Sequence, residues 1–301
     1  MKKCYVYAGV TVLIWSTLAV TVKLLLADIP NFQALCISSV FAFVFLLALN
    51  IVNGSIQSLR RCRARDLLLM AGLGFLGLFM YSALYYYGIG ALGSQEACIL
   101  NYLWPVMIVV FACVILKEPF TLRKLCAILM SFSGIVVLTA AKPVGASQSR
   151  LLGVIACIAA AVCYGLFSVL NKLHSLDQNV TMMCIWFTVA LCSFVAGMLF
   201  EQWVPVRGAQ WAGLAWLGTA VDAVAYLLWA LALKDAKDSA RIANFAYLVP
   251  FLSMILSAVA AGERMTLGAV FALLLIVGGI LLQSLPSRKA KGEKRRNKKQ
   301  F

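Results

Sequence analysis

The densest group of residues suited to binding chemistry is the run Asn101-Tyr102-Leu103-Trp104-Pro105, in the middle of an apolar segment. Pro105 has no backbone N–H, so the carbonyl group of Asn101 loses its helical hydrogen-bond donor. In lipid, such a carbonyl is costly unless water, protein or a ligand satisfies it. The run therefore suits a zwitterion with an apolar body. A packed helix kink is the alternative explanation for the proline alone.

Further aromatic residues lie near the centres of other apolar segments, where anchoring at a membrane surface does not explain them. Residues three or four apart share one face of a helix, and two aromatic pairs have this spacing. Packing is the alternative role for any single ring. The additional binding candidates are Tyr81 with Tyr85, Tyr226 with Trp229, and Trp15, Ser16 and Tyr164.

Ionisable residues inside apolar segments are candidates for coupling or gating, because each costs about 2.5–3.5 kcal/mol at mid-bilayer. Asp222 lies near the middle of its segment, whereas Lys23, Glu96 and Lys172 lie nearer to segment ends. Three roles are open for Asp222: proton coupling, pairing with a cation such as Lys23, or contact with water in a cavity. Snorkelling toward the membrane surface is the alternative for the two lysines.

Composition explains which elements must position these residues. The 301-residue chain is 63% hydrophobic and 12% charged, more apolar material than a soluble domain can bury. No alternating strand pattern is visible, so membrane-spanning helices are expected. We predict ten of them: residues 5–27, 32–52, 67–90, 94–116, 122–140, 151–173, 180–200, 210–233, 236–261 and 267–285.

The net charge of +15 reflects membrane topology rather than a nucleic-acid partner. Eight of the 26 basic residues lie after Pro286, with no aromatic residues between them to stack on bases. With the N-terminus in the cytoplasm, 21 basic residues fall on the inner side and four on the outer side. The positive-inside rule then predicts a multi-pass membrane protein with both termini cytoplasmic.

Several classes of chemistry have no support in the sequence. Ten cysteines and a single histidine form no C-x-x-C or metal-ligand spacing, so neither a metal site nor a disulfide framework is expected. A phosphate-binding loop and a catalytic triad are also missing. We predict a protein that is not an enzyme and that has no cofactor.

The chain repeats itself at an interval of 145 residues. Tyr102-Leu103-x-Pro105 aligns with Tyr247-Leu248-x-Pro250, and Glu118-x-x-Thr121 aligns with Glu263-x-x-Thr266. Each copy holds five predicted helices, an odd number, so the second copy enters the membrane inverted. We predict repeats at 1–145 and 146–286, followed by a basic cytoplasmic tail at 287–301. Inverted repeats favour a carrier that works by alternating access.

With these residues in view, the chain resembles the drug/metabolite transporter superfamily of EamA type, in particular the YddG-type aromatic amino-acid exporters. The resemblance implies a ten-helix fold with a central cavity and export of aromatic and other neutral amino acids. Tyr164 departs from the pattern, which has tryptophan there. The resemblance is carried by Trp15-Ser16-Thr17, Asn101-Tyr102-Leu103-Trp104-Pro105, Asn171-Lys172, Ala225-Tyr226-x-x-Trp229 and Tyr247-x-x-Pro250.

Two other functions stay open from the residues. One is export of cationic drugs or other metabolites, and the other is a membrane channel or interaction subunit without alternating access. The expected partners are a small-molecule substrate, an amino acid by the resemblance, and the lipid bilayer, with no nucleic acid. No feature of the sequence indicates an oligomeric state.

Overall fold

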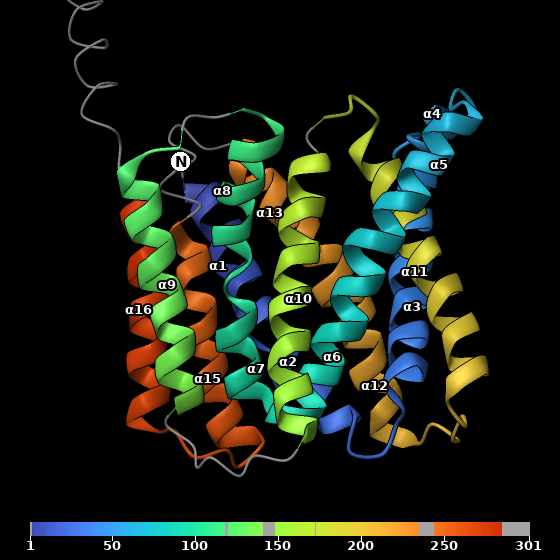
Figure 1. The fold of residues 1–301 in the computed structure, drawn as a ribbon. Coiled ribbons are helices and arrows are strands. Elements are labelled where there is room, and N and C mark those ends of the chain that lie inside the picture. Colours follow the sequence, from blue (N-terminus) through green and yellow to red (C-terminus); the bar gives the residue numbers. More distant parts are fainter. Residues whose placement is uncertain (1, 118–119, 141–147, 172, 235–243, 285–301) are drawn as a thin grey trace, which may run out of the picture.

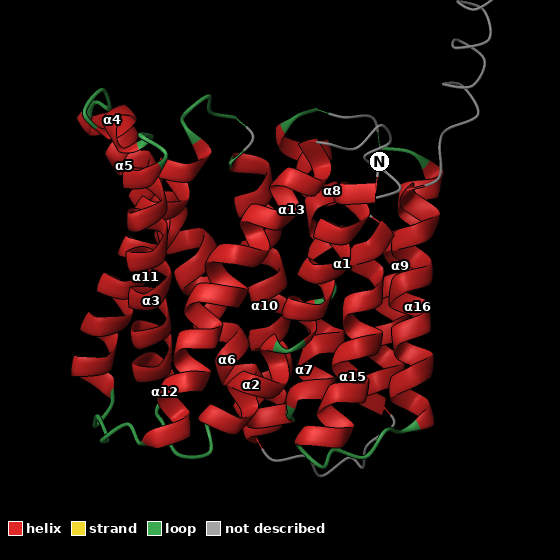
Figure 2. Ribbon diagram, turned by 180° about the vertical axis from the view of Figure 1, so that it is seen from behind, coloured by secondary structure: helices red, strands yellow, loops and turns green. Residues whose placement is uncertain are grey.

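The computed structural model describes residues 2–117, 120–140, 148–171, 173–234 and 244–284. Regular structure in these ranges is helical throughout, as predicted. Most helices run roughly side by side and form one bundle (Figures 1 and 2). Two predictions, Lys172 and the basic tail 287–301, lie outside the described residues.

The first half of the chain runs back and forth between the two ends of the bundle, with the short helix α4 at one end (Figure 1). They are α1 (Lys2–Ser16), α2 (Leu18–Leu25), α3 (Asn31–Val52), α4 (Ile56–Leu59), α5 (Ala64–Leu73), η1 (Gly74–Phe79), α6 (Met80–Leu92), α7 (Ser94–Asn101), α8 (Trp104–Ile115) and α9 (Leu122–Ala140).

The second half adds a similar series, which packs against the first. It contains α10 (Gln148–Leu170), α11 (Gln178–Phe200), α12 (Gly208–Ala215), η2 (Trp216–Val224), α13 (Ala225–Lys234), η3 (Asn244–Leu248), α15 (Val249–Ala260) and α16 (Leu267–Ser284).

Within the described ranges, seven helical segments of 22 to 29 residues are long and apolar enough to cross a membrane. Three shorter apolar helices, Lys124–Leu138, Val249–Ala260 and Leu267–Leu282, occupy other predicted segments. The all-helical membrane class is therefore supported, while the count of ten spans stays a prediction. The seven long segments are Lys3–Leu25, Asn31–Val52, Ala64–Leu92, Ser94–Ile115, Gln148–Leu170, Gln178–Phe200 and Gly208–Trp229.

One span is broken beside its proline. α7 ends at Asn101 and α8 begins at Trp104, with Pro105 near the start of the new helix. Proline is tolerated there because a first-turn N–H has no helical acceptor. The second half repeats this arrangement, since Pro250 lies in the first turn of α15, directly after the 3₁₀ turn η3. The break therefore coincides with the proline, where the loss of one helical hydrogen bond was expected.

Helix boundaries recur at the interval of 145 residues. Trp104–Ile115 (α8) and Val249–Ala260 (α15) correspond at both ends, and α9 and α16 begin at corresponding leucines. The π-helical segment η1, shifted by this interval, falls within the π-helical segment η2. The recurrence at helix ends agrees with the repeat of sequence motifs.

Corresponding helices also pack against each other. α9 contacts α16, and α3 contacts α11. The Ser131 hydroxyl lies 3.3 Å from the carbonyl oxygen of Ile276, its partner at the interval. A Cβ atom on Gly134 would lie only 2.7 Å from the Ala272 carbonyl oxygen. In lipid, apolar helices have no hydrophobic driving force to associate, so they depend on close packing. Small residues such as glycine allow the two backbones to approach this closely.

Two carboxylates tie helix starts together at the end of the bundle opposite to the first residues of α1. Glu263 accepts hydrogen bonds from the N–H groups of Ser94 and Gln95, at 2.6 and 2.8 Å. Glu201 accepts them from Phe32 and Gln33, at 2.9 and 3.1 Å. These contacts satisfy the free N–H groups at the starts of α7 and α3 and place negative charge at the positive end of each helix dipole.

Candidate functional site

A cavity of about 280 Å³ lies inside the bundle, between helices of both halves. Within the described part of the chain, its wall includes six tyrosines, four tryptophans and a few polar side chains. An apolar wall with few polar groups is the usual form of a small-molecule site. Its aromatic members are Trp15, Tyr81, Tyr85, Tyr86, Tyr102, Trp104, Tyr164, Trp186, Tyr226 and Trp229.

The break between α7 and α8 delivers three predicted residues to this cavity. Because the chain leaves the α-helical path at Tyr102, residues on both sides of the break reach the same wall. The Asn101 amide nitrogen donates to the Tyr81 hydroxyl at 3.1 Å, while its Oδ1 has no partner among the described residues. The Tyr102 hydroxyl donates to the Ala246 carbonyl, which joins the two broken regions.

The aromatic rings hold one another in place. The Tyr164 ring lies 5.0 Å from the Tyr81 ring and 5.3 Å from the Trp104 ring, measured between centroids. The Trp15 ring lies 5.4 Å from those of Tyr226 and Trp229. Edge-on and tilted contacts of this kind stabilise aromatic pairs by about 0.5–1.5 kcal/mol beyond area burial. The wall is therefore organised before any ligand enters.

Asp222 is the acidic member of the wall. It lies in η2, is 7% exposed, and its Oδ2 has no hydrogen-bond partner within the described ranges. π-helical turns are rare and occur frequently at functional sites. Lys23, the cation considered as its partner, lines a different cavity. No described ion pair involves Asp222.

Three predicted residues do not line the central cavity. Ser16 is fully buried, and its hydroxyl donates to the Val12 carbonyl of its own helix at 2.6 Å. Pro105 shapes the break instead of contacting the space. Asn171 follows the end of α10. The side chain of Tyr247 lies outside the described part of the structure, as does Lys172.

Asn171 organises the turn between α10 and α11. Its Oδ1 lies 2.9 Å from His174 Nε2, and its amide nitrogen donates to Gln178 Oε1 at 3.3 Å. The N–H of Leu176 donates to His174 Nδ1, so the ring accepts at Nδ1 and donates at Nε2 as a neutral imidazole. Partial burial lowers the pKa of His174, which agrees with the neutral form.

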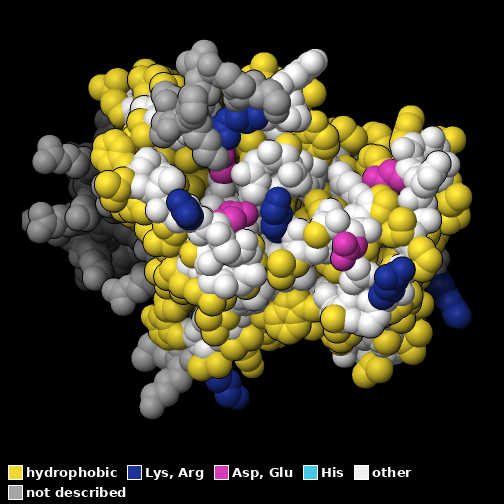
Figure 3. Space-filling model, turned by 90° about the horizontal axis from the view of Figure 1, so that it is seen from below, with side chains coloured by type: hydrophobic (Ala, Val, Ile, Leu, Met, Phe, Trp, Pro, Cys, Tyr) yellow, Lys and Arg dark blue, Asp and Glu magenta, His cyan; other side chains and the backbone are white. Residues whose placement is uncertain are grey.

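A second cavity, of about 560 Å³, opens toward the end where Glu263 caps α7. Lys23, Glu96, Glu263 and Arg264 contribute to its lining. Figure 3 views this end and shows acidic and basic side chains across a polar middle that is surrounded by apolar side chains. The two predicted end-of-helix charges, Lys23 and Glu96, thus belong to this charged cavity and not to the aromatic one.

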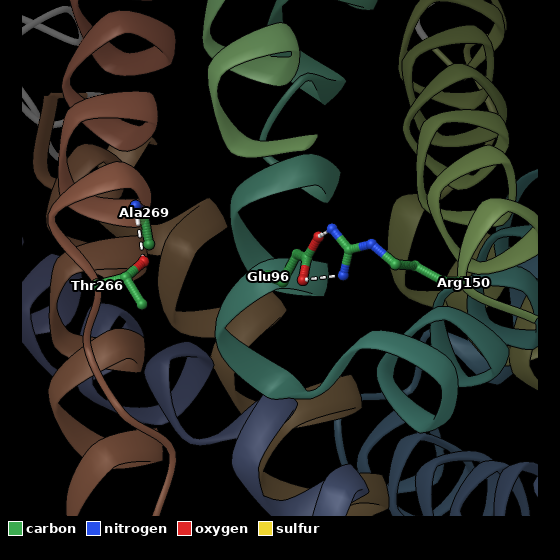
Figure 4. A network of polar contacts seen from close by, with 4 residues as sticks. All are labelled: Glu96, Arg150, Thr266 and Ala269. Atoms are coloured by element: carbon green, nitrogen blue, oxygen red, sulfur yellow. Dashed lines mark hydrogen bonds and ion pairs between the residues drawn. The ribbon is translucent and has the colours of Figure 1, made fainter. Parts of the chain in front are cut away.

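A two-pronged ion pair lies beside that cavity. Arg150, at the start of α10, reaches the Glu96 carboxylate of α7 with Nη1–Oε2 and Nη2–Oε1 distances of 3.0 and 2.5 Å (Figure 4). The side chains are only 16% and 6% exposed, respectively. Charged, paired hydrogen bonds in a partly buried place fix both distance and orientation. The pair therefore ties a helix of the first half to one of the second.

Several wall residues escaped the sequence analysis. Tyr86 and Trp186 line the cavity, as do Ser82, Ser168 and Ser253. Tyr86 directly follows Tyr85, and helical periodicity alone places neighbours on different faces. Trp186 lies in an evenly apolar helix without a marked face.

In the described ranges, no group of three His, Cys, Asp or Glu side chains could hold a metal ion.

Comparison with known proteins places these features in a family. Residues 2–140 and 151–285 each match the EamA-like transporter family. A solved crystal structure with 24% sequence identity covers 96% of this chain and 99% of its own, with a TM-score of 0.70. That similarity shows a shared fold.

Three relatives share 22% to 27% sequence identity with this chain. An aromatic amino acid exporter, YddG, from Ancylobacter novellus is 26% identical and covers 92% of this chain and 96% of its own length. The transporter YoaV of Bacillus subtilis is 22% identical over 90% of this chain and 93% of its own. A probable terminal-alkyne amino-acid exporter from Streptantibioticus cattleyicolor is 27% identical over 72% of each chain.

Proposed function

Because the chain belongs to the EamA-like transporter family, we propose that it exports aromatic and other neutral amino acids by alternating access. The observation that carries this proposal is the aromatic cavity that lies between the two halves. A site of that kind, at the interface of repeats, can open to either side when one half rocks against the other.

The repeat supports the proposed mechanism. Helix boundaries recur at 145 residues, and the family matches the chain twice, over 2–140 and 151–285. We therefore propose an arrangement of ten spans in two inverted halves, at 1–145 and 146–286. Two halves of similar structure and opposite direction give inward-open and outward-open states of similar energy. A channel or a passive subunit would not need this duplication.

The substrate class rests on the wall and on the named relatives. The wall of the cavity is mainly aromatic, and such a wall suits an aromatic or aliphatic side chain. Two relatives at 26% and 27% identity are named as exporters of amino acids, one of them of aromatic amino acids. We propose the same class here, because wall chemistry and relatives agree.

The proposed orientation has both termini in the cytoplasm of a bacterial cell, with the chain in the inner membrane. Its support is the split of 21 basic residues against four. In Figure 1 the basic segment Arg60–Arg65 lies at the same end as the beginning of α1, consistent with this orientation. The charged cavity beside Glu96 would then face the outside.

Counterflow in liposomes tests the proposal. Purified full-length protein is reconstituted, the vesicles are loaded with unlabelled tryptophan, and entry of tritiated tryptophan, phenylalanine or leucine is followed. A carrier gives a transient overshoot that saturates with substrate. Uptake that neither saturates nor responds to internal substrate would indicate a channel, and the absence of any amino-acid flux would reject the substrate class.

A further inference from the structure

Asp222 is the one acidic residue among the described residues that line the aromatic cavity. Its side chain is 93% buried, since only 7% is exposed, and it lines the aromatic cavity. Oδ2 accepts no hydrogen bond in the described part of the chain. An isolated acid within an apolar span is costly and is retained where it contacts a functional partner. The cavity is the space beside Asp222 from which a partner can come.

The surroundings of Asp222 favour positive charge. None of the described wall residues is Lys, Arg or His. Tyrosine and tryptophan rings attract cations through their faces. Asn101 adds an unpaired side-chain oxygen and a carbonyl that lost its helical donor to Pro105. Carboxylate, carbonyl and ring faces all complement a cation.

Among the described residues of the cavity wall, the acid comes from the second half alone. At the interval of 145 residues, Asp222 corresponds to Gly77. A Cβ atom on Gly77 would lie 2.7 Å from Cγ of Phe167, so the first half has no room for a side chain there. The negative pole of the cavity is therefore single and lies on the η2 side. A ligand that binds by charge has one direction in which to lie.

We propose that the central cavity takes molecules with a protonated nitrogen on an aromatic body, and that Asp222 receives this nitrogen. The proposal rests on the function proposed above and narrows its substrates to ammonium-bearing compounds. Aromatic amino acids and aromatic amines share this chemistry. Aromatic acids that lack the nitrogen do not, and the cavity should reject them.

A carboxylate on the ligand is accommodated by neutral donors. Trp186 and Ser253 both line the cavity, and neither the Trp186 indole N–H nor the Ser253 hydroxyl has a partner in the described ranges. An indole N–H and a hydroxyl can donate to a carboxylate, but with less energy than a charged group provides. The ammonium end should therefore dominate affinity, while the carboxylate end modulates it.

Three ligands with one ring system separate the contributions. Tryptophan carries both charges, tryptamine only the ammonium, and indole-3-propionate only the carboxylate. Binding to full-length protein in detergent is measured by competition with tritiated tryptophan and tritiated tryptamine. In wild type, we expect the Kd of indole-3-propionate to exceed that of tryptamine by at least about tenfold.

Variants then assign the effect to one residue. Asp222→Asn keeps the shape and should raise the Kd of tryptamine at least about tenfold, with little change for indole-3-propionate. Asp222→Glu keeps the charge and should retain the preference for ammonium, which guards against misfolding of the first variant. Asp28→Asn removes an exposed carboxylate outside the cavity and should leave all three ligands unchanged. Gel filtration verifies that each variant is folded.

The outcomes divide cleanly. Equal affinity of wild type for tryptamine and indole-3-propionate overturns the proposal, as does an unchanged preference in Asp222→Asn or a failure to bind any of the three. Tryptamine binding without tryptophan binding supports it and identifies the substrates as amines. If amino-acid counterflow is observed but the protein binds tryptamine and indole-3-propionate equally well, the proposed transport function is retained and only this inference is rejected.

Discussion

The ion pair between Glu96 and Arg150 allows a measurement of how tightly the two halves are joined. Replacing Arg150 by methionine keeps most of the side-chain volume and removes both hydrogen bonds to the carboxylate, at 3.0 and 2.5 Å. Glu96 then stays in a place where its side chain is only 6% exposed. Breaking a buried pair costs about 3–5 kcal/mol, and the 16% exposure of Arg150 favours the lower value.

A double-mutant cycle separates the pair from the single substitutions. We expect Arg150→Met to lower the free energy of unfolding by about 3 kcal/mol. Combining it with Glu96→Gln should restore much of that loss, with a coupling energy of about 2 kcal/mol. SDS-induced unfolding in mixed micelles gives the free energies. Arg264→Met, an exposed arginine at the same cavity, serves as the control and should change stability by less than about 0.5 kcal/mol. A coupling below about 0.5 kcal/mol would refute the reasoning.

Four further predictions follow from the same structure. Trp104→Ala should weaken binding of an aromatic substrate by about 2- to 12-fold beyond the loss of area, and unchanged counterflow at equal protein would mean that the ring only packs. Gly218→Ala would press a Cβ atom into the backbone of α3 and should cost about 1–3 kcal/mol. Gly9→Ala, within α1, faces open space and should be neutral or stabilising by up to about 1 kcal/mol in the same unfolding assay. Burial and two nearby carboxylates raise the pKa of the Cys62 thiol. Its alkylation rate, measured by mass spectrometry, should therefore continue to increase at pH values above about 8.5, the usual pKa of a free thiol. In intact cells, Cys62 should react only with a membrane-permeant maleimide, because its loop is proposed to face the cytoplasm. A cysteine introduced by Asp28→Cys should also react with an impermeant maleimide, and the reverse pattern would contradict the proposed orientation.

Local chemistry explains which features could be predicted from the sequence. Pro105 must interrupt a helix wherever that helix lies, so the break between α7 and α8 needed no knowledge of neighbours. The same reasoning placed Asn101, Tyr102 and Trp104 at one point, and all three line the cavity. Motifs matched at 145 residues likewise anticipated helix boundaries that recur at that interval.

Helix orientation is the part that sequence could not supply. In a soluble helix, apolar residues mark the buried face, but lipid is as apolar as the protein interior. α11 is apolar on all sides, so nothing distinguished Trp186, which points to the cavity, from Phe187, which is 51% exposed. The π-helical turn η2 adds a local rotation that the 3.6-residue period does not describe.

Long-range polar partners were equally out of reach. Glu263 binds the start of α7 from 168 and 169 residues away, and Glu96 meets Arg150 across the boundary between the two halves. In the sequence, Glu263 was visible only as part of a repeated motif, and Glu96 only as a charge near the end of a segment. Asn171 carried the family resemblance, yet its amide serves the turn around His174. Which of several local options a polar side chain adopts depends on neighbours that only the fold provides.

The difference between the two halves bears on how a carrier could handle a charged ligand. Tyr81 and Tyr226 correspond at the repeat interval and both line the cavity, so the aromatic wall is shared by the two halves. Gly77 and Asp222 correspond as well, but Phe167 fills the space at Gly77, and a matching acid cannot be added without repacking. If the halves exchange conformations during transport, the aromatic wall is similar in the inward-open and outward-open states. The acid, in contrast, always belongs to η2 of the second half. A ligand held by its ammonium would keep its attachment to one half as access alternates, and the other half would move past it.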